Sequence, residues 1–543
     1  MHRLRRPSAL LLAALVLVAA FAGLSVTRHA VAPRLARSAA VRDVLDTPRD
    51  ARALAHGERW TSVRVTPVDR TTTRVSFFAG PRLLAEAAVL PSGRVEQFAD
   101  YRGSVVAYGA QLAQRPWLVA LSCLAFLLAT VVLPLRRVRN LDALALLALL
   151  VPLVLLNERL VVASTLSAVP SLLWLTGRCG WRAFGANAGE SAPAQPLFDA
   201  LTPAWDDAQR VRVLRVAVGA AAAAVAMITI SAPSTVDVGQ AVMEVGTLLL
   251  HGTLPYGHMP GDVFHGDTYP LLSYLAYVPL AALMPVHDSW DVANGALIVA
   301  AASALGIAWL LARFAGATPA PPAAGLRAAL AWLTCPPLFV AVSSGTSDVL
   351  LAALLAGALV LSQRRLASAA LIVAAGWFKL VPFALLPIWL ARLRGRQLAA
   401  ALALLAGSAA ATWALLVALG GAGAPVRMLH AIGYQLDRRT LHSPWTLLGI
   451  EWLQPLAQAG VLALVAGAAV RARRDAAFAA DPLRLAAFAG AVLLGLQLCG
   501  NYWTYLYLAW AAPCVVLSLL ADAPCPEPAR APAAVPAREP ALV

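Results

Sequence analysis

Apolar stretches of 17–22 residues recur along the whole chain, and they constrain its fold more than any other feature. Each is close to the length that an α-helix needs to cross about 30 Å of hydrocarbon. Only 13% of the residues are charged, which is about half the fraction usual for a soluble domain. The pattern predicts an all-α polytopic protein of the cell membrane.

Arginine accounts for most of the net charge of +15, and the arginines cluster beside the apolar stretches. This placement is typical of cytoplasmic flanks that fix the orientation of membrane helices. No segment outside the membrane has an obvious basic surface, so we expect no nucleic-acid partner. The six cysteines lie in or beside apolar stretches or in segments placed in the cytoplasm. We therefore expect neither a disulfide framework nor a cysteine-based metal site.

Changes in composition divide the chain into six segments. They are residues 1–27, a signal anchor or first transmembrane helix; 28–115, an exported soluble domain; 116–176, an N-terminal membrane unit; 177–212, a cytoplasmic loop; 213–520, the main membrane core; and 521–543, a disordered cytoplasmic tail. A cleaved signal peptide is the alternative for the first segment. Alternating apolar residues and turn residues between Thr61 and Phe98 predict a small β-rich or α+β domain without catalytic groups.

The arginine clusters then assign a side of the membrane to each loop. The apolar stretch 271–285 is interrupted by prolines, so we place it as a helix at the outer interface instead of a crossing. The remaining stretches give about fourteen transmembrane helices with both chain ends in the cytoplasm. In this arrangement residues 234–270 and 420–451 both lie on the outer face.

The loop from Ser234 to Pro270 holds an unusual concentration of side chains that can exchange protons. Asp237 follows the apolar stretch Val213–Ala232 by a few residues. A carboxylate at this place can act as a general base, taking the proton of a sugar hydroxyl as that hydroxyl attacks an activated carbon. The alternative is structural, because Asp is also a good N-cap for the helical pattern that follows.

The rest of this loop supplies candidate groups for binding an acceptor or a sugar. They are Tyr256, His258, Asp262, His265, Asp267 and Tyr269. Aromatic rings stack on sugar faces, and His and Asp side chains bond to hydroxyls. The prolines rule out a helix on which the seven-residue spacing of the histidines would place them on one face. A metal held by His258, Asp262, His265 and Asp267 is the minor alternative, and we expect no metal or other cofactor.

Two outer segments carry candidate ligands for a phosphate. Lys379 is a lone cation between short apolar stretches, and the loop 420–451 contains Arg438, Arg439 and His442. A buried cation needs an anionic partner, and a lipid phosphate would supply one. The alternatives are that Lys379 reaches the headgroups along its aliphatic stem and that the loop charges are merely solvated.

Taken together, these residues resemble the C-type (GT-C) multi-spanning glycosyltransferases, and in particular the bacterial branch of polyprenol-phosphate-mannose-dependent mannosyltransferases. The resemblance covers roughly Val213 to Leu520. It is carried by Asp237, by GTLPYG at 252–257, by YPLL at 269–272, by GTSD at 345–348, by Phe378 and Lys379 with Pro382, and by HSPW at 442–445.

The resemblance implies a GT-C-like catalytic core with Asp237 as the base and with Lys379, Arg438, Arg439 and His442 on the donor phosphate. The implied activity is transfer of a hexose such as mannose, with inversion, from a polyprenyl-phosphate sugar donor to an envelope glycan or glycolipid acceptor. The site would face the extracytoplasmic side. A transporter or lipid flippase is the first alternative, although the predicted span centres are nearly free of charge and no internal repeat is visible. A non-catalytic scaffold for envelope assembly is the second.

Overall fold

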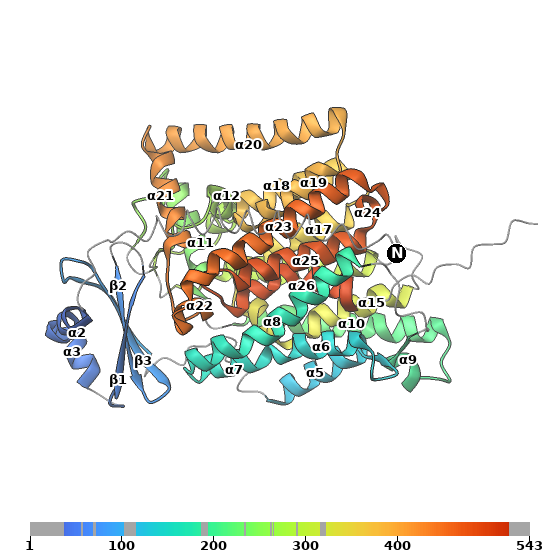
Figure 1. Cartoon of the computed structure of the whole chain (residues 1–543), viewed down its shortest axis with the longest axis horizontal. Helices are drawn as coiled ribbons and strands as arrows, with labels where there is room; N and C mark the ends of the chain where they lie inside the picture. The colour runs from blue at the N-terminus through green and yellow to red at the C-terminus, as the bar shows by residue number, and fades with distance from the viewer. Residues whose placement is uncertain are drawn as a thin grey trace, which may run out of the picture.

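The computed structural model describes residues 37–55, 58–68, 72–101, 116–185, 194–232, 235–260, 263, 265–288, 291–314 and 322–520. The predicted signal anchor, the predicted tail and Asp262 lie outside the described residues. The described chain forms a small domain next to a larger helical body (Figure 1). The fold is mostly helical, with a four-stranded sheet in the small domain, as the sequence predicts, and a two-stranded sheet of β5 (Val132–Leu133) and β6 (Gln195–Pro196) in the helical body.

The small domain contains two helices packed on a four-stranded antiparallel sheet. Its elements are α2 (Arg37–Asp46), α3 (Pro48–Ala55), β1 (Ser62–Pro67), β2 (Thr73–Ala79), β3 (Arg82–Val89) and β4 (Val95–Asp100), with the strands in sequence order. Val75 and Phe77 alternate along β2 toward the helices and form a core with Val44 and Val89. This period of two is what the sequence pattern indicates, and the domain is of the α+β kind.

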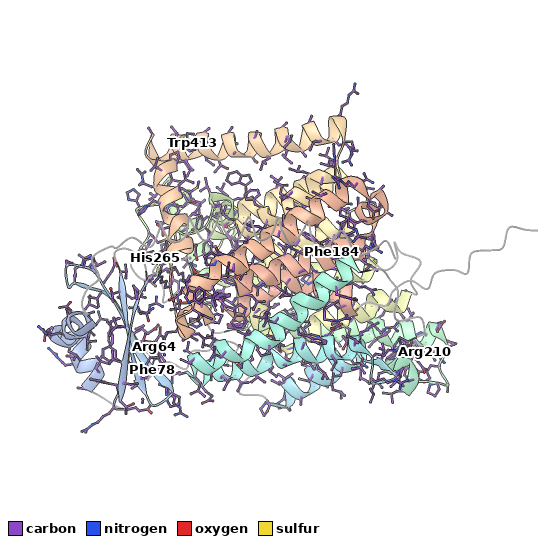
Figure 2. All side chains as sticks on the ribbon, viewed as in Figure 1. Arg64, Phe78, Phe184, Arg210, His265 and Trp413 are labelled. Atoms are coloured by element: carbon purple, nitrogen blue, oxygen red, sulfur yellow. The ribbon has the colours of Figure 1, made fainter. Side chains whose placement is uncertain are left out.

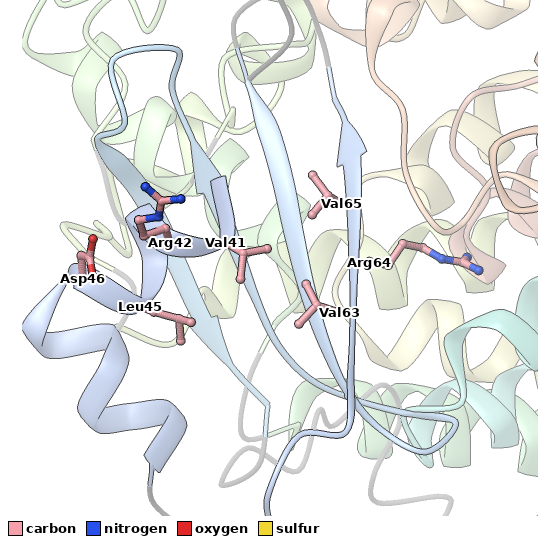
Figure 3. A pocket seen from close by; sticks show the side chains of 7 residues that line it. All are labelled: Val41, Arg42, Leu45, Asp46, Val63, Arg64 and Val65. Atoms are coloured by element: carbon pink, nitrogen blue, oxygen red, sulfur yellow. The ribbon is translucent and has the colours of Figure 1, made fainter. Parts of the chain in front are cut away.

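The two faces of this sheet have different neighbours. The helices α2 and α3 cover one face, and the other face is turned toward the helical body (Figure 1). Arg64 and Phe78 lie on that second side (Figure 2). A groove of about 730 Å³ lies between α2 and the edge strand β1, lined by Val41, Leu45 and Val63 among others (Figure 3).

The helical body begins with an N-terminal unit. It comprises α5 (Pro116–Thr130), β5 (Val132–Leu133), α6 (Val138–Ala148), α7 (Leu150–Asn157), α8 (Val161–Phe184), β6 (Gln195–Pro196) and α9 (Leu197–Leu201). A capping box then starts the next helix: the Gln209 backbone N–H donates to the Asp206 carboxylate at 2.7 Å, and the Asp206 N–H donates back to the Gln209 side chain at 2.9 Å.

The core follows as a succession of helices and helical turns. They are α10 (Asp207–Ile230), α11 (Asp237–Leu250), α12 (Leu271–Leu275), α13 (Val278–Ala281), α14 (Asn294–Phe314), α15 (Pro322–Thr334), α16 (Pro336–Ser343), α17 (Asp348–Val360), α18 (Arg365–Phe378), η2 (Val381–Leu385), α19 (Leu386–Ala391), α20 (Gly395–Gly420), α21 (Ala424–Asp437), α22 (Pro444–Leu448), η3 (Glu451–Leu453), α23 (Gln454–Arg474), α24 (Ala476–Ala480), α25 (Pro482–Leu498), η4 (Tyr505–Tyr507), α26 (Leu508–Val515) and η5 (Val516–Leu520).

Five helices among the described residues are long and apolar enough to cross a membrane. They are Val138–Asn157, Asp207–Ile230, Asn294–Phe314, Gly395–Gly420 and Glu451–Arg474. The pair Ala323–Thr334 and Pro336–Ser343, which bends by 61°, makes a sixth if it is one span. The other apolar helices have only 10–17 residues. A multi-pass membrane protein is thus confirmed, whereas the count of fourteen crossings stays a prediction.

Burial differs strongly between two helices of the core. In α25 most residues are buried, including the whole run from Leu485 to Gly495, and this helix packs along α8. In α20, which has 26 residues, only Ala401 and Leu416 are buried. Figure 1 shows α20 running along one side of the body, apart from the other helices. A side-chain contact joins it to α18, since the Trp377 indole N–H donates to the Ser408 hydroxyl at 2.8 Å.

Candidate active site

The starts of α11 and α17 come together at a close backbone contact. The Val236 N–H donates to the carbonyl oxygen of Ser344 at 3.0 Å. A side chain at Gly239 would collide with the carbonyl oxygen of Gly345, and Gly345 itself has a left-handed φ of 67°. Two glycines thus allow two helix N-termini to approach, although they lie about a hundred residues apart in sequence.

Asp237 is the first residue of α11 and its side chain is exposed. Its Oδ1 accepts the backbone N–H of Val238 at 2.9 Å. The N-cap position belongs to Val236, which has no capping side chain, so the capping role that the sequence suggests for Asp237 falls one residue earlier. The carboxylate lies at the positive end of a helix dipole and is accessible to a ligand.

Asp348, the first residue of α17, is fully buried and has three partners. It forms an ion pair with Lys379 and accepts a hydrogen bond from the Thr346 hydroxyl. The Trp510 indole N–H donates to its Oδ1 at 2.6 Å. The sequence shows no acidic neighbour for Lys379, and the structure supplies one from 31 residues earlier. Lys379 is itself only 5% exposed, so its charge is balanced within the protein.

Tyr269 lies where these charged groups meet. The Lys379 Nζ is 4.8 Å from the centre of its ring. Burial raises the pKa of Tyr269 well above its ordinary value, and the charges of Asp237 and Asp348 raise it further, while Arg438 opposes them. One side chain from each of α11 and α17, and Arg438 from the end of α21, therefore act electrostatically on one phenol.

Five aromatic rings lie beside the two cations Arg438 and Lys379, in two stacked pairs and one edge-to-face contact, and Arg438 lies over both Tyr434 and Tyr502. We call these five residues, His265, Tyr434, Tyr502, Tyr507 and Trp510, the aromatic wall. His265 stacks on Tyr434 at 3.6 Å, Tyr502 lies 6.0 Å from Tyr507, and Tyr507 stacks on Trp510 at 4.2 Å between ring centres. The Lys379 Nζ is 5.6 Å from the Trp510 ring.

Arg438 packs flat against this wall. Its Cζ is 3.6 Å from the Tyr502 ring centre and 6.0 Å from that of Tyr434. Burial lowers the pKa of Arg438, but the neighbouring tyrosines outweigh burial and raise it overall. The guanidinium keeps its full charge, and, unlike Lys379, it forms no ion pair with a carboxylate among the described residues. It is the better placed of the two to bind an external anion.

The two other predicted phosphate ligands have different surroundings. Burial lowers the pKa of His442 to about 4, so its ring is neutral near pH 7 and can offer a hydrogen bond but no charge. The ring lies 5.1 Å from Tyr502, beside the aromatic wall. The backbone N–H of Arg439 donates to the carbonyl oxygen of Val68 at 2.8 Å, which ties this loop to the small domain.

The predicted acceptor ligands of the first outer loop do not all lie beside Tyr269 and the aromatic wall. Tyr256 is fully buried and its hydroxyl donates to the Tyr269 carbonyl at 2.8 Å, so it supports the loop. Burial raises the pKa of Asp267, whose carboxylate accepts a backbone hydrogen bond from Gly257. His258 is exposed. Within the described part of the chain, no three His, Cys, Asp or Glu side chains gather as metal ligands.

Several residues of this site could not be predicted from the sequence. Asp348 stood in the GTSD motif but received no role, because the partner that defines it is distant in sequence. Tyr434, Tyr502 and Trp510 carry no charge, and an aromatic residue in an apolar stretch is usually part of the core. These rings come close to one another only in the folded protein, so the sequence gives no signal that they share a site.

Comparison with known protein families adds one finding. Residues 268–499 match Glycosyltransferase family 87, a family of GT-C membrane glycosyltransferases. The match covers less than half of the chain, and it includes Tyr269, Asp348, Lys379, Arg438 and His442. Asp237, Tyr502 and Trp510 lie outside the matched segment. Searches of curated proteins and of solved structures gave no significant match.

Proposed function

We propose that this protein transfers a hexose such as mannose from a polyprenyl-phosphate donor to an envelope glycan or glycolipid, with inversion at the anomeric carbon. The observation that carries the proposal is the gathering of Asp237, Lys379 and Arg438 around Tyr269. An attack on a sugar phosphate requires a base for the acceptor proton and a cation for the leaving phosphate.

In the proposed reaction the Asp237 carboxylate takes the proton of an acceptor hydroxyl. The hydroxyl oxygen forms a bond to the anomeric carbon as the bond from that carbon to the phosphate oxygen breaks. The bonding electron pair leaves with the lipid phosphate. Arg438 stabilises the charge that develops there, and Lys379 contributes less because Asp348 already neutralises much of its charge.

The aromatic wall is a surface suited to binding a sugar. The apolar face of a pyranose packs on aromatic rings, and His442 in its neutral form can bond to a hydroxyl or a phosphate oxygen. His265, stacked on Tyr434, forms the end of the wall nearest the first outer loop. Of the acceptor ligands that the sequence suggests, His265 and Tyr269 are therefore the two that we keep at the site.

The decisive experiment follows labelled sugar. Purified protein in lipid is incubated with a labelled polyprenyl-phosphate hexose and an extracted pool of envelope acceptors. Label should move to the acceptor pool in the presence of wild-type protein. If wild-type protein binds the donor and moves no label, the scaffold alternative is preferred, and if it moves intact donor across vesicles, the flippase alternative is preferred.

We also propose that the site faces the outside of the cell membrane, as the arrangement with about fourteen crossings requires. A cysteine replacing the exposed His258 should react with an impermeant thiol reagent on intact cells, and one replacing the exposed Arg396 should not. Labelling of the wild-type protein gives the background from the native cysteines. The reverse pattern would place the site inside.

A further inference from the structure

The small N-terminal domain is fastened to the core beside the site. Two backbone hydrogen bonds join this domain to the helical body. The Leu83 N–H donates to the carbonyl oxygen of Arg159 at 3.0 Å, and the Arg439 N–H donates to the carbonyl oxygen of Val68 at 2.8 Å. Phe78 and Leu83 pack with Val161 and Leu441 in a small apolar cluster. Backbone hydrogen bonds and an apolar cluster thus fix the orientation of the sheet.

The sheet face turned toward the core is polar. Arg64 pairs with Ser76 across β1 and β2, and Ser76 pairs with Glu86 across β2 and β3, so these side chains lie side by side. The Ser76 hydroxyl donates to Glu86 at 2.8 Å, and Arg74 forms an ion pair with Glu86 at 3.9 Å. Figure 3 shows the Arg64 side chain pointing from the sheet toward the core.

This polar face lies close to His442, because the preceding residue, Leu441, packs against Phe78 and Leu83 of the same sheet. The charges of Glu86 and Arg74 both act on the pKa of His442, and the charge of Arg74 also acts on that of Tyr502. Coulombic effects of this kind weaken with distance and are screened by salt. The Arg74 and Glu86 side chains are 16% and 15% exposed, so they are sheltered but still reachable.

We propose that this face, with Arg74 and Glu86 as its principal ligands, binds the acceptor glycan and presents its hydroxyl to Asp237; the inference rests on the proposed function. A polyhydroxylated ligand needs both donors and acceptors at fixed positions. Glu86 supplies carboxylate oxygens, and Arg74 has five N–H donors of which the ion pair uses a small part.

The test uses full-length protein in lipid with Glu86→Gln and Arg74→Gln. The probe is an extracted envelope oligosaccharide pool labelled at its reducing ends. Each variant should weaken oligosaccharide binding and raise the acceptor KM by about tenfold, as expected from loss of one or two charge-assisted hydrogen bonds. The donor KM and the unfolding temperature should remain near the wild-type values.

The matched controls change the same charges on the opposite layer of the same domain. Arg42→Gln and Asp46→Asn alter exposed residues of α2 and should leave oligosaccharide binding unchanged. Equal effects in controls and test variants, or wild-type binding by stable Glu86→Gln and Arg74→Gln proteins, would overturn the inference. If wild-type protein binds oligosaccharide through these residues but transfers no sugar, the inference stands and the proposed transfer reaction fails.

Discussion

The starts of α11 and α17 are alike in sequence position and opposite in environment. Each helix begins with an aspartate, and the two turns touch at Gly239 and Gly345. Asp237 is exposed and bonds only to its own helix among the described contacts. Asp348 is fully buried and holds Lys379, Thr346 and Trp510.

This difference separates two uses of a carboxylate at one site. A fully buried carboxylate with an ion pair and two hydrogen bonds is closed to a substrate, so Asp348 fixes the geometry of its neighbours. An exposed carboxylate at a helix N-terminus costs little to maintain and can exchange a proton with a ligand. Chemistry should therefore depend on the first aspartate and stability on the second.

The largest expected effect is on turnover in Asp237→Asn. The amide oxygen can still accept the Val238 N–H, so folding and donor binding should persist. It cannot take a proton, and sugar transfer should fall by roughly 10²–10⁴-fold. The rate with saturating donor and acceptor measures this. Near-normal turnover would remove Asp237 as the base.

Asp348→Ala should instead act on the free energy of unfolding. The change leaves the Lys379 ammonium buried without a counter-charge, which costs about 3–5 kcal/mol. Adding Lys379→Met should recover much of this loss, because both charges are then gone. Thermal unfolding in lipid measures both proteins. A single variant as stable as wild type would show that the ion pair contributes nothing.

Donor affinity should distinguish the two cations. Arg438→Ala removes the cation that lacks a carboxylate partner among the described residues, and donor binding should weaken by about 1.5–3 kcal/mol. Lys379→Met in the Asp348→Ala background should weaken binding less. Equilibrium binding of a polyprenyl-phosphate hexose measures both. A larger loss from the lysine change would reverse their proposed importance.

The smallest effect is a pH dependence from His442. Its folded pKa of about 4 lies below the ordinary value of about 6.5. As the pH falls from about 6.5 to 4, the unfolded chain binds a proton that the folded chain does not, so the free energy of unfolding should fall through this range. His442→Gln should flatten this slope in pH-dependent thermal unfolding. An unchanged slope would assign it to other groups.

Local patterns in the sequence predict part of this molecule well. Period-two alternation and turn residues predict the α+β domain, and apolar length predicts the membrane helices. Asp237 and Lys379 stand out because acidic residues and lysine are rare beside the apolar stretches, where most charges are arginines. The partner of Lys379 could not be predicted, because Asp348 is 31 residues away and meets it only through helix packing. The number of crossings also depends on breaks such as that at Pro336, where two helices bend by 61°.

The exposed helix α20 is longer than the hydrocarbon layer of a membrane is thick. At 1.5 Å per residue its 26 residues reach about 39 Å, whereas the hydrocarbon layer is about 30 Å thick. Because only Ala401 and Leu416 are buried, few contacts with neighbouring helices fix its inclination. We therefore expect bilayer thickness to influence the tilt of α20, and the Trp377 to Ser408 hydrogen bond would carry that tilt to α18, the helix that ends beside Lys379.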